Sequence, residues 1–436
     1  MIFVLIKSIF TNSSGILVSR LTGFLRDVLT ASILGANIFS DIFFIAFKIP
    51  NLFRSIFAEG AFTQAFIPAY ARTKHKVRFT SVVFLQFLAF ILFLSLLVTL
   101  FSHVLTKALA LGFDDATIDL AAPLVAINFY YLPIIFVVTF LAALLQYKHH
   151  FATTAYSTAL LNLALIGALL ISHNMDKYTI TYYLSYGVIV GGLLQLFVHL
   201  IAIKQKNLFK AFNFKDLKKS STEKFYKNFL SSTMGSSTNQ LVAFVDTLLA
   251  SFLVAGNISY LYYANRVFQL PLALFAIATS IALFPMVARA IKNNEENKAL
   301  QLMRKSFLIL LGVLTVSAVI GIVFDHFIIE LLFQRGAFTQ EDTQNTALIL
   351  SMYLIGLLPY GLAKIFSLWL YSNNQQFIAA KISMKALLCN VIFSLILIVP
   401  FEAAGLALSS TLSGFILFFL TIKEFGFKRF FILIKG

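Results

Sequence analysis

The sequence predicts an all-α polytopic membrane protein, with about twelve transmembrane helices in two six-helix lobes around a central cationic cavity. Of its 436 residues, 59% are hydrophobic and 12% are charged, whereas soluble domains carry about 25% charged residues. The apolar runs are continuous and long enough to cross a bilayer as helices, and they lack the alternation of a β-barrel. Landmarks that recur in both halves of the chain indicate the two lobes.

Twelve apolar segments, separated by polar or charged breaks, are the expected membrane spans. They are residues 9–34, 38–68, 80–103, 119–145, 152–172, 180–203, 229–255, 258–288, 304–324, 344–371, 380–400 and 403–422. The opening MIFVLIKSIF lacks the basic start and the small-residue cleavage site of a secretory signal, so the first helix is expected to remain as an anchor.

The charges in the loops predict the orientation of these spans. With the N-terminus inside, 24 of the 34 basic residues fall in cytoplasmic segments and three fall outside. Nine acids lie on the outer side against five inside. Because Lys and Arg collect in cytoplasmic loops, both termini are predicted to be cytoplasmic, and the net charge of +16 needs no nucleic-acid partner to explain it.

The longest hydrophilic stretch lies near the middle of the chain and contains eight lysines between residues 204 and 227. We expect an N-terminal six-helix lobe over 1–203, a cytoplasmic basic linker over 204–228 and a C-terminal six-helix lobe over 229–436. A plain linker is the simpler interpretation, and binding of anionic lipid headgroups is the alternative.

An internal repeat supports the two lobes. DVLTASIL at residues 27–34 resembles DTLLASFL at residues 246–253, and prolines follow at corresponding places in each half. Two lobes related by an axis along the membrane normal are typical of such a parallel repeat, and substrate is expected to pass between them.

Ten charged residues remain inside the predicted spans after the loops are accounted for. Each costs at least about 2.5 kcal/mol at the centre of a membrane helix, so they are expected to face a water-filled or protein-lined cavity. They are the cations Arg20, Arg26, Lys48, Arg54, Arg266 and Lys364 and the acids Asp27, Asp41, Glu59 and Asp246.

The excess of cations in the first two helices indicates an anionic ligand. The planar fork of arginine binds phosphate oxygens bidentately, so Arg20, Arg26 and Arg54 are a candidate phosphate or diphosphate clamp. Salt bridges among the charged groups alone are the alternative.

Arg20 and Arg26 lie about 120° apart on a regular helix, so a break or bend near Gly15 or Gly23 is expected. Pro50 is expected to kink the second helix, either as a moving hinge or as a static bend.

Asp246 is an isolated intramembrane acid of the second half. It is a candidate ligand of a coupling cation or a proton carrier, and a salt bridge to Arg266 is the alternative.

Motif searches argue against an enzyme. The chain has no GxxxxGK[ST] phosphate loop, its seven histidines fall in loops or at the ends of spans, and its single cysteine, Cys389, cannot form an internal disulfide. No catalytic arrangement of Ser, His and Asp can be argued.

Three stretches of sequence resemble the MurJ/MviN family of lipid II flippases. The first covers residues 20–68 and begins RLTGFLRDVLTASILGAN, the second is YYANRVFQLPLALFAIATSIALFPMVA at 262–288, and the third is LLFQRGAFTQEDT at 331–343. The resemblance implies the fold of the multidrug/oligosaccharidyl-lipid/polysaccharide exporter superfamily. It also implies that a set of cavity charges holds the lipid II diphosphate: Arg20, Arg26, Asp27, Asp41, Lys48, Arg54, Glu59 and Arg266.

The resemblance further implies the partners and the location of the protein. Lipid II would be carried from the inner to the outer leaflet of the bacterial cytoplasmic membrane, for cell-wall synthesis and cell shape, by a monomer that works beside other cell-wall proteins. Membrane lipids are the remaining partners. A sodium site is implied at Asp246, Asn390 and Ser410, where a further carboxylate of the family is Ser394 in this chain. No other cofactor is implied.

One departure from the family concerns the number of helices. Family members resemble this chain but have fourteen helices, the last two forming a groove for the lipid tail, whereas this sequence has room for twelve. Either the tail binds elsewhere or the groove is dispensable. The alternative function is a cation-coupled exporter of drugs or of another polyprenyl-diphosphate glycolipid. A membrane-bound lipid-phosphate enzyme would need an acidic metal motif, which is not visible, and a scaffold for cell-wall synthesis is a further alternative.

Overall fold

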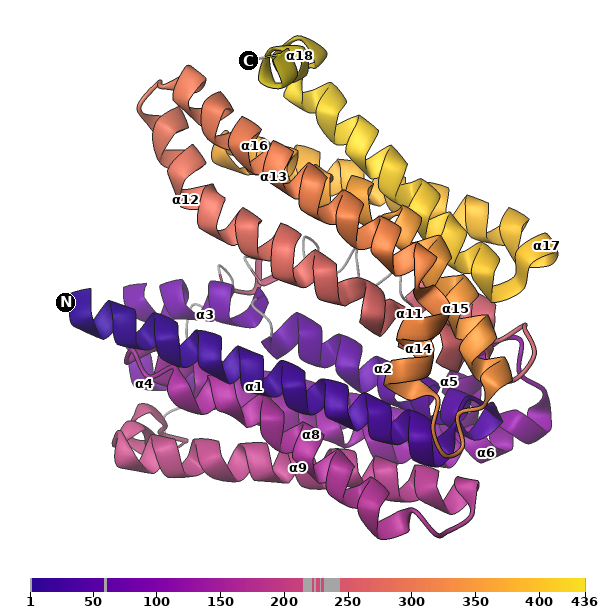
Figure 1. Ribbon diagram of the computed structural model, residues 1–436. Coiled ribbons are helices and arrows are strands. Elements are labelled where there is room, and N and C mark those ends of the chain that lie inside the picture. Colours follow the sequence, from indigo (N-terminus) through magenta and orange to yellow (C-terminus); the bar gives the residue numbers. More distant parts are fainter. Residues whose placement is uncertain are drawn as a thin grey trace. The chain divides into compact units, whose positions relative to one another are not determined.

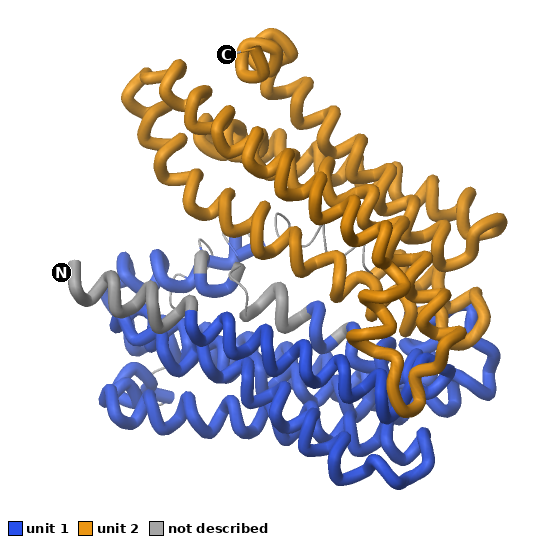
Figure 2. Tube along the Cα trace, viewed as in Figure 1, with its two compact units in different colours: residues 1–237 blue, residues 238–436 orange. Residues whose placement is uncertain are grey.

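The computed structural model describes residues 2–58, 61–214, 222, 225–227, 229–230 and 244–435, without the side chains of 2–13, 49, 53–58, 61 and 64. The described residues are helical or lie in short connections. Contacts divide the chain into two compact units, residues 1–237 and 238–436 (Figure 2). The predicted boundaries of the two lobes and the linker, after residues 203 and 228, stay predictions.

Unit 1 is built from long helices and short connectors (Figure 1). Its elements are α1 (Ile2–Leu34), α2 (Ile38–Ala58), α3 (Ala61–Arg72), α4 (Lys76–Leu100), α5 (Ser102–Leu109), α6 (Asp115–Phe129), α7 (Tyr131–Tyr147), α8 (Ala152–Ser172), α9 (Lys177–Gln205) and the 3₁₀ turn η1 (Leu208–Ala211).

Unit 2 begins, in its described part, with the helical residues 244–250. There follow α11 (Asn257–Pro271), the π-helix η2 (Leu272–Ile277), α12 (Ala278–Lys292), α13 (Glu296–Val323), α14 (Asp325–Phe333), α15 (Gln340–Ile355), α16 (Leu357–Ser372), α17 (Gln376–Phe425) and α18 (Phe427–Lys435).

Eight described segments are long and apolar enough to cross a membrane. Seven of them coincide with one expected span each, and the eighth, the 50-residue α17, contains two. Its backbone reverses at Glu402, where φ is 49° and ψ is −130°, just after Pro400. α1 and α2–α3 occupy the first two expected spans, whereas most of the span 229–255 lies outside the described residues. The predicted fold class is confirmed.

Aromatic side chains form the core at one end of unit 1. Phe62 packs against Phe66, Phe87, Phe136 and Phe140, with ring centroids 5.3–6.0 Å apart. Phe225, from the basic stretch expected to be a linker, is 1% exposed in the same cluster. The backbone N–H of Asn213 donates to Ser81 Oγ at 2.8 Å. The described parts of the basic stretch therefore pack on unit 1.

Small residues let the helices that carry the candidate site approach closely. On α1, a Cβ added to Gly15 would meet the Cβ of Ala155 on α8 at 2.6 Å. On α9, a Cβ added to Gly191 would meet the backbone of Leu161 at 2.8 Å. Close backbone approach at glycine is a common way to pack membrane helices, which have no hydrophobic gain from leaving lipid.

The first helix is not broken near Gly15 or Gly23, and the alternative of a bend stays a prediction. α1 is one continuous helix from Ile2 to Leu34, and both Gly15 and Gly23 lie inside it. A glycine weakens a helix by about 1 kcal/mol relative to alanine but does not break it by itself. Here both glycines serve contact with α8, because a Cβ at Gly23 would lie 3.2 Å from Asn162 Nδ2.

Candidate functional site

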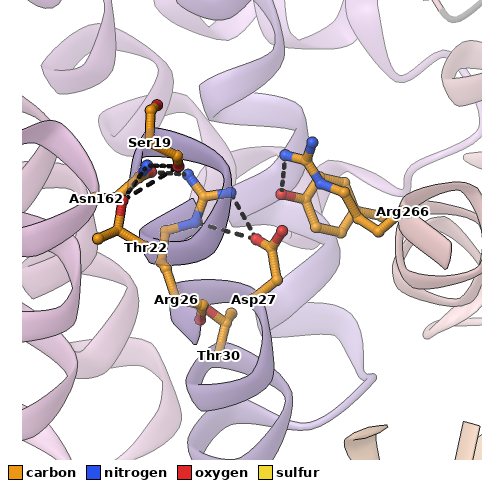
Figure 3. Close-up of polar contacts among 8 residues, drawn as sticks. Ser19, Thr22, Arg26, Asp27, Thr30, Asn162 and Arg266 are labelled. Atoms are coloured by element: carbon orange, nitrogen blue, oxygen red, sulfur yellow. Dashed lines mark hydrogen bonds and ion pairs between the residues drawn. The ribbon is translucent and has the colours of Figure 1, made fainter. Parts of the chain in front are cut away.

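Arg26 and Asp27 form a buried ion pair in the C-terminal third of the continuous helix α1 (Figure 3). Asp27 Oδ1 accepts from Arg26 Nε at 3.0 Å and from Arg26 Nη2 at 2.6 Å. Arg26 is 8% exposed and Asp27 2% exposed. A buried cation is strongly destabilising unless it is paired and hydrogen-bonded, so Asp27 makes burial of this guanidinium tolerable.

Asn162 of α8 supplies a further acceptor to the same guanidinium. Its Oδ1 accepts from Arg26 Nη1 at 3.0 Å, and its Nδ2 donates to the Ser19 carbonyl at 3.0 Å and to Thr22 Oγ1 at 3.3 Å (Figure 3). One amide thus joins two turns of α1 to α8 and fixes the direction of Arg26. Sequence reasoning missed Asn162, although a polar amide inside the apolar run 152–172 is a usable signal, since such groups join membrane helices.

Arg20 and Arg26 do not share a face of α1. Arg20 is exposed and Arg26 is buried, as the 120° separation of a regular helix requires. Because α1 does not break between them, the structure does not direct both guanidinium groups to one side of this helix. Any single anion held by both must therefore reach around α1.

The structure describes the side chains of two of the four charged residues expected in the second span, Asp41 and Lys48. Asp41 is 1% exposed in the first turn of α2, where the positive end of the helix dipole favours an acid. Lys48 follows two turns later, on the same face by helical spacing, and is half-buried. Pro50 lies inside the same helix. The side chain of Arg54 and all of Glu59 lie outside the described residues.

Arg266 of unit 2 is held by an aromatic residue one turn earlier on α11. Its Nη2 donates to the Tyr262 hydroxyl at 2.8 Å, and its guanidinium carbon lies 4.9 Å from the centre of that ring (Figure 3). Stacking on an aromatic face orients a guanidinium without neutralising it. The Tyr262 ring and hydroxyl therefore help to set the direction of the Arg266 guanidinium.

Asp246, Ser410 and Asn390, for which the family resemblance implies a sodium site, meet inside unit 2. Ser410 Oγ donates to Asp246 Oδ2 at 3.2 Å, and Asn390 Nδ2 donates to Ser410 Oγ at 3.3 Å. Asn390 and Ser394 are fully buried, and among the described residues Asn390 Oδ1 and Ser394 Oγ have no hydrogen-bond partner. One carboxylate and several neutral oxygens are the ligands that hard cations prefer, so this set fits a sodium ion.

The fold and these buried charges together define a class of protein: a transporter of the MOP superfamily type. A MATE multidrug transporter structure in an inward-facing conformation superposes on this chain with a TM-score of 0.76 at 14% identity, over 96% of each chain, which is a likeness of fold alone. A structure described as lipid II flippase MurJ, inward closed conformation, superposes with a TM-score of 0.85 at 27% identity, over 97% of this chain and 90% of that one.

Sequence comparison places the chain within one family of this class. The model of the family described as lipid II flippase MurJ matches residues 30–433. A probable lipid II flippase MurJ of Helicobacter pylori strain J99 is 49% identical, over 93% of this chain and 92% of its own length. The corresponding protein of Aquifex aeolicus is 32% identical, over 88% of this chain and 76% of its own length. The chain belongs to the MurJ lipid II flippase family.

Membership confirms two predictions. The protein is a multi-pass membrane transporter rather than an enzyme, and the family read from the three sequence blocks is the one found. The roles of individual residues stay predictions.

Proposed function

We propose that the protein carries lipid II from the inner to the outer leaflet of the cytoplasmic membrane by alternating access. The observation that supports this most directly is the buried Arg26 network, together with 49% identity to a probable lipid II flippase over 93% of the chain. A drug exporter would be expected to use an acidic and aromatic site, whereas the charges in α1 and α2 have a cationic excess.

The substrate-binding set is the one derived from the sequence: Arg20, Arg26, Asp27, Asp41, Lys48, Arg54, Glu59 and Arg266. In this scheme Arg26 binds diphosphate oxygens, pre-oriented by Asp27 and Asn162 of its own unit. Asp27 stabilises the Arg26 guanidinium when no substrate is bound, and a diphosphate of higher charge competes for it. Differential binding of the diphosphate in the two access states then shifts their populations.

The direct test measures transport of labelled lipid II by the purified protein in liposomes. Arg26→Ala should lower the rate at least about tenfold, since a charge-assisted hydrogen bond contributes roughly 1.5–3 kcal/mol. Arg72→Ala, which removes an exposed arginine at the end of α3, is the matched control and should transport normally. Wild-type transport by the Arg26→Ala protein would overturn the proposed role of this network.

A sodium ion bound by Asp246, Asn390 and Ser410, with Ser394 beside them, is proposed as the coupling cation. When bound, sodium would supply a positive charge that neutralises Asp246 and joins the helical residues 244–250 to α17. Ser394 is neutral where the family resemblance leads one to expect a carboxylate, so the site carries one negative charge fewer and weaker sodium binding is expected.

Thermal unfolding in sodium and in potassium chloride at equal ionic strength tests this site. A ligand at ten times its dissociation constant stabilises the folded state by about 1.4 kcal/mol, so sodium should raise the unfolding temperature of the wild type. Ser410→Ala should abolish that difference, whereas Ser409→Ala, whose hydroxyl donates to the Gly405 carbonyl, should keep it. Equal stability of the wild type in both salts would exclude a sodium site.

Location and assembly follow from the proposed activity. We propose a monomer in the bacterial cytoplasmic membrane with both termini inside, because 24 of its 34 basic residues then lie in cytoplasmic segments. The product would be delivered to other proteins of cell-wall synthesis on the outer side.

A further inference from the structure

The nine-residue helix α18 is amphipathic in a way that the transport scheme does not use. It begins directly after Gly426, whose φ of 102° is open to glycine and turns the chain at the end of α17. Figure 1 shows α18 as a short helix set at an angle to the end of α17. This turn ends α17 at Phe425 and starts α18 at Phe427.

One face of α18 is fixed to unit 2. Leu433 is 2% exposed, and the Phe430 ring lies 5.5 Å from that of Phe366 on α16 and 6.2 Å from that of Phe307 on α13. Arg429 Nε donates to Glu296 Oε1 at 2.8 Å, and its guanidinium lies 5.2 Å from the ring of Trp369. α18 is therefore docked, and its remaining faces have a fixed direction.

A second face is apolar and exposed. Phe427, Phe431 and Ile434 are 43%, 58% and 41% exposed. At about 100° per residue these three positions fall within an arc of about 60°. Three large apolar side chains held outward on a docked helix need a partner that is itself apolar.

Lysines border one side of this apolar face, between it and Ile432, which is 52% exposed. Lys428 and Lys435 are both exposed and lie within about 20° of each other on the helix, directly beside Phe431. Lys423, on the last turn of α17, is also exposed, next to the exposed Glu424. Arg429 is already paired with Glu296, so Lys428 and Lys435 carry the charge of the outward surface. Long lysine side chains beside an apolar stripe are typical of a helix at the level of lipid headgroups.

We propose that α18 lies in the membrane interface and binds anionic phospholipids. Phe427, Phe431 and Ile434 enter the boundary of the acyl chains, and Lys428 and Lys435 bind the phosphates of anionic headgroups. The occupant is the bilayer rather than a soluble protein because the helix follows a membrane-spanning segment by a single residue, Gly426, and its charge is opposite to that of anionic lipid. The predicted cytoplasmic side makes this the inner leaflet.

The experiment uses the full chain with its one cysteine removed by Cys389→Ser. An environment-sensitive fluorophore is attached at Phe431→Cys or, as the control position, at Asn297→Cys in the exposed first turn of α13. Each protein is placed in phosphatidylcholine vesicles that contain increasing fractions of phosphatidylglycerol, with and without lipids that carry a quencher near the headgroup.

The label at 431 should be quenched more strongly than the label at 297. Its quenching and its shift to an apolar emission should both increase as the fraction of phosphatidylglycerol increases. Lys428→Gln with Lys435→Gln should weaken binding to anionic lipid, so a larger phosphatidylglycerol fraction should be needed for half the change. The matched pair Lys292→Gln with Lys298→Gln should leave it unchanged. Fluorescence of the single tryptophan, Trp369, reports whether α18 stays docked in each variant, because Arg429 stacks on it.

Three results would overturn the proposal. One is a label at 431 that is as exposed to water as the label at 297. A second is a fluorescence signal from the label at 431 that does not respond to phosphatidylglycerol. A third is a label at 431 that enters an apolar environment only when a soluble protein is added, which would assign this face to a protein partner.

Discussion

Arg26 lies inside a membrane helix with its charge balanced by the adjacent residue of the same helix. Neighbouring side chains on a helix point in different directions, but the long arginine side chain curls so that Nε and Nη2 both reach Asp27 Oδ1. This leaves Nη1 for Asn162, on another helix. Two neighbours within unit 1, Asp27 and Asn162, therefore orient the guanidinium.

Asn162→Ala is expected to impair transport more than it impairs folding. The change removes the acceptor of Arg26 Nη1 and the amide that joins α1 to α8, which should cost about 1–3 kcal/mol of stability. Transport of labelled lipid II should fall about tenfold as Arg26 loses its fixed direction. Thermal unfolding and transport are measured on the same preparation.

Asn128→Ala is the matched control for this prediction. Asn128 is also a fully buried amide of unit 1, and its Nδ2 donates to Ser185 Oγ at 2.8 Å across a helix pair, but its described partners are uncharged. It should lose similar stability and keep its transport rate per folded molecule. Equal transport losses in the two variants would mean that Asn162 acts only through packing.

At the scale of elements, the reversal inside α17 depends on two positions. One is a non-glycine residue with a positive φ, and the other is a glycine with no room for a Cβ. Glu402 has a φ of 49°, which costs a non-glycine residue of order 1–3 kcal/mol together with its unusual ψ. Gly405 has no space for a side chain, because a Cβ there would lie 2.1 Å from the Leu397 carbonyl oxygen. The two expected spans 380–400 and 403–422 are thus joined by a turn that is strained at one position and tight at another.

Substitutions at these two positions should change the free energy of unfolding in opposite directions. Glu402→Gly should raise the free energy of unfolding by up to about 1 kcal/mol, since glycine adopts positive φ freely. Gly405→Ala should lower it by more than about 2 kcal/mol, because the backbone of the turn must move. Thermal unfolding in detergent measures both, and a destabilised Glu402→Gly protein would show that the Glu402 side chain contributes more than its backbone costs.

Two exposed aspartates cap helices on the predicted outer side. The pKa of Asp114 is lowered by the hydroxyl and the backbone N–H of Thr117, and the pKa of Asp176 is lowered in the same way by Thr179. A carboxylate whose pKa is lower in the folded state than in the unfolded state stabilises the protein above the unfolded pKa. This stability is lost as the pH falls through the folded pKa.

We therefore expect Asp114→Asn with Asp176→Asn to flatten the loss of stability below about pH 4, because an amide oxygen still accepts the N–H but does not titrate. Unfolding temperatures at pH 6 and pH 3 measure this. Glu295→Gln is the control, since Glu295 precedes α13 without capping it through its side chain. If the double variant and the wild type lose the same stability on acidification, the caps do not titrate as proposed.

At the scale of the whole molecule, the distribution of charge predicts which loops face the cytoplasm. In the Cys389→Ser background, Asn174→Cys, in the loop before α9, should react with a membrane-impermeant maleimide in intact cells. Asn293→Cys, in the turn after α12, should react only after permeabilisation. Both positions are exposed in the structure. Labelling with the opposite pattern would invert the proposed topology and with it the leaflet assigned to α18.

Composition and local pattern determined the class of the protein and most of its spans. Continuous apolar runs can satisfy the backbone in lipid only as helices, so the sequence was enough for the fold class. The cost of burying charge marked Arg26, Asp27, Arg266 and Asp246 in advance, because that cost depends on residue type and depth, not on neighbours. The resemblance added the set of Asp246, Asn390 and Ser410, which the structure brings together.

Tertiary packing decided what those residues contact. The sequence predicted a break or bend of the first helix near Gly15 or Gly23. In the structure α8 packs beside both glycines, and the helix is continuous. Asn162 and Tyr262 orient the two arginines, and neither partnership is visible in the sequence, because it requires the register of one helix against another or the rotamer of a side chain one turn away. The sequence alone determined which groups are expensive to bury, and the packed structure decided how that cost is met.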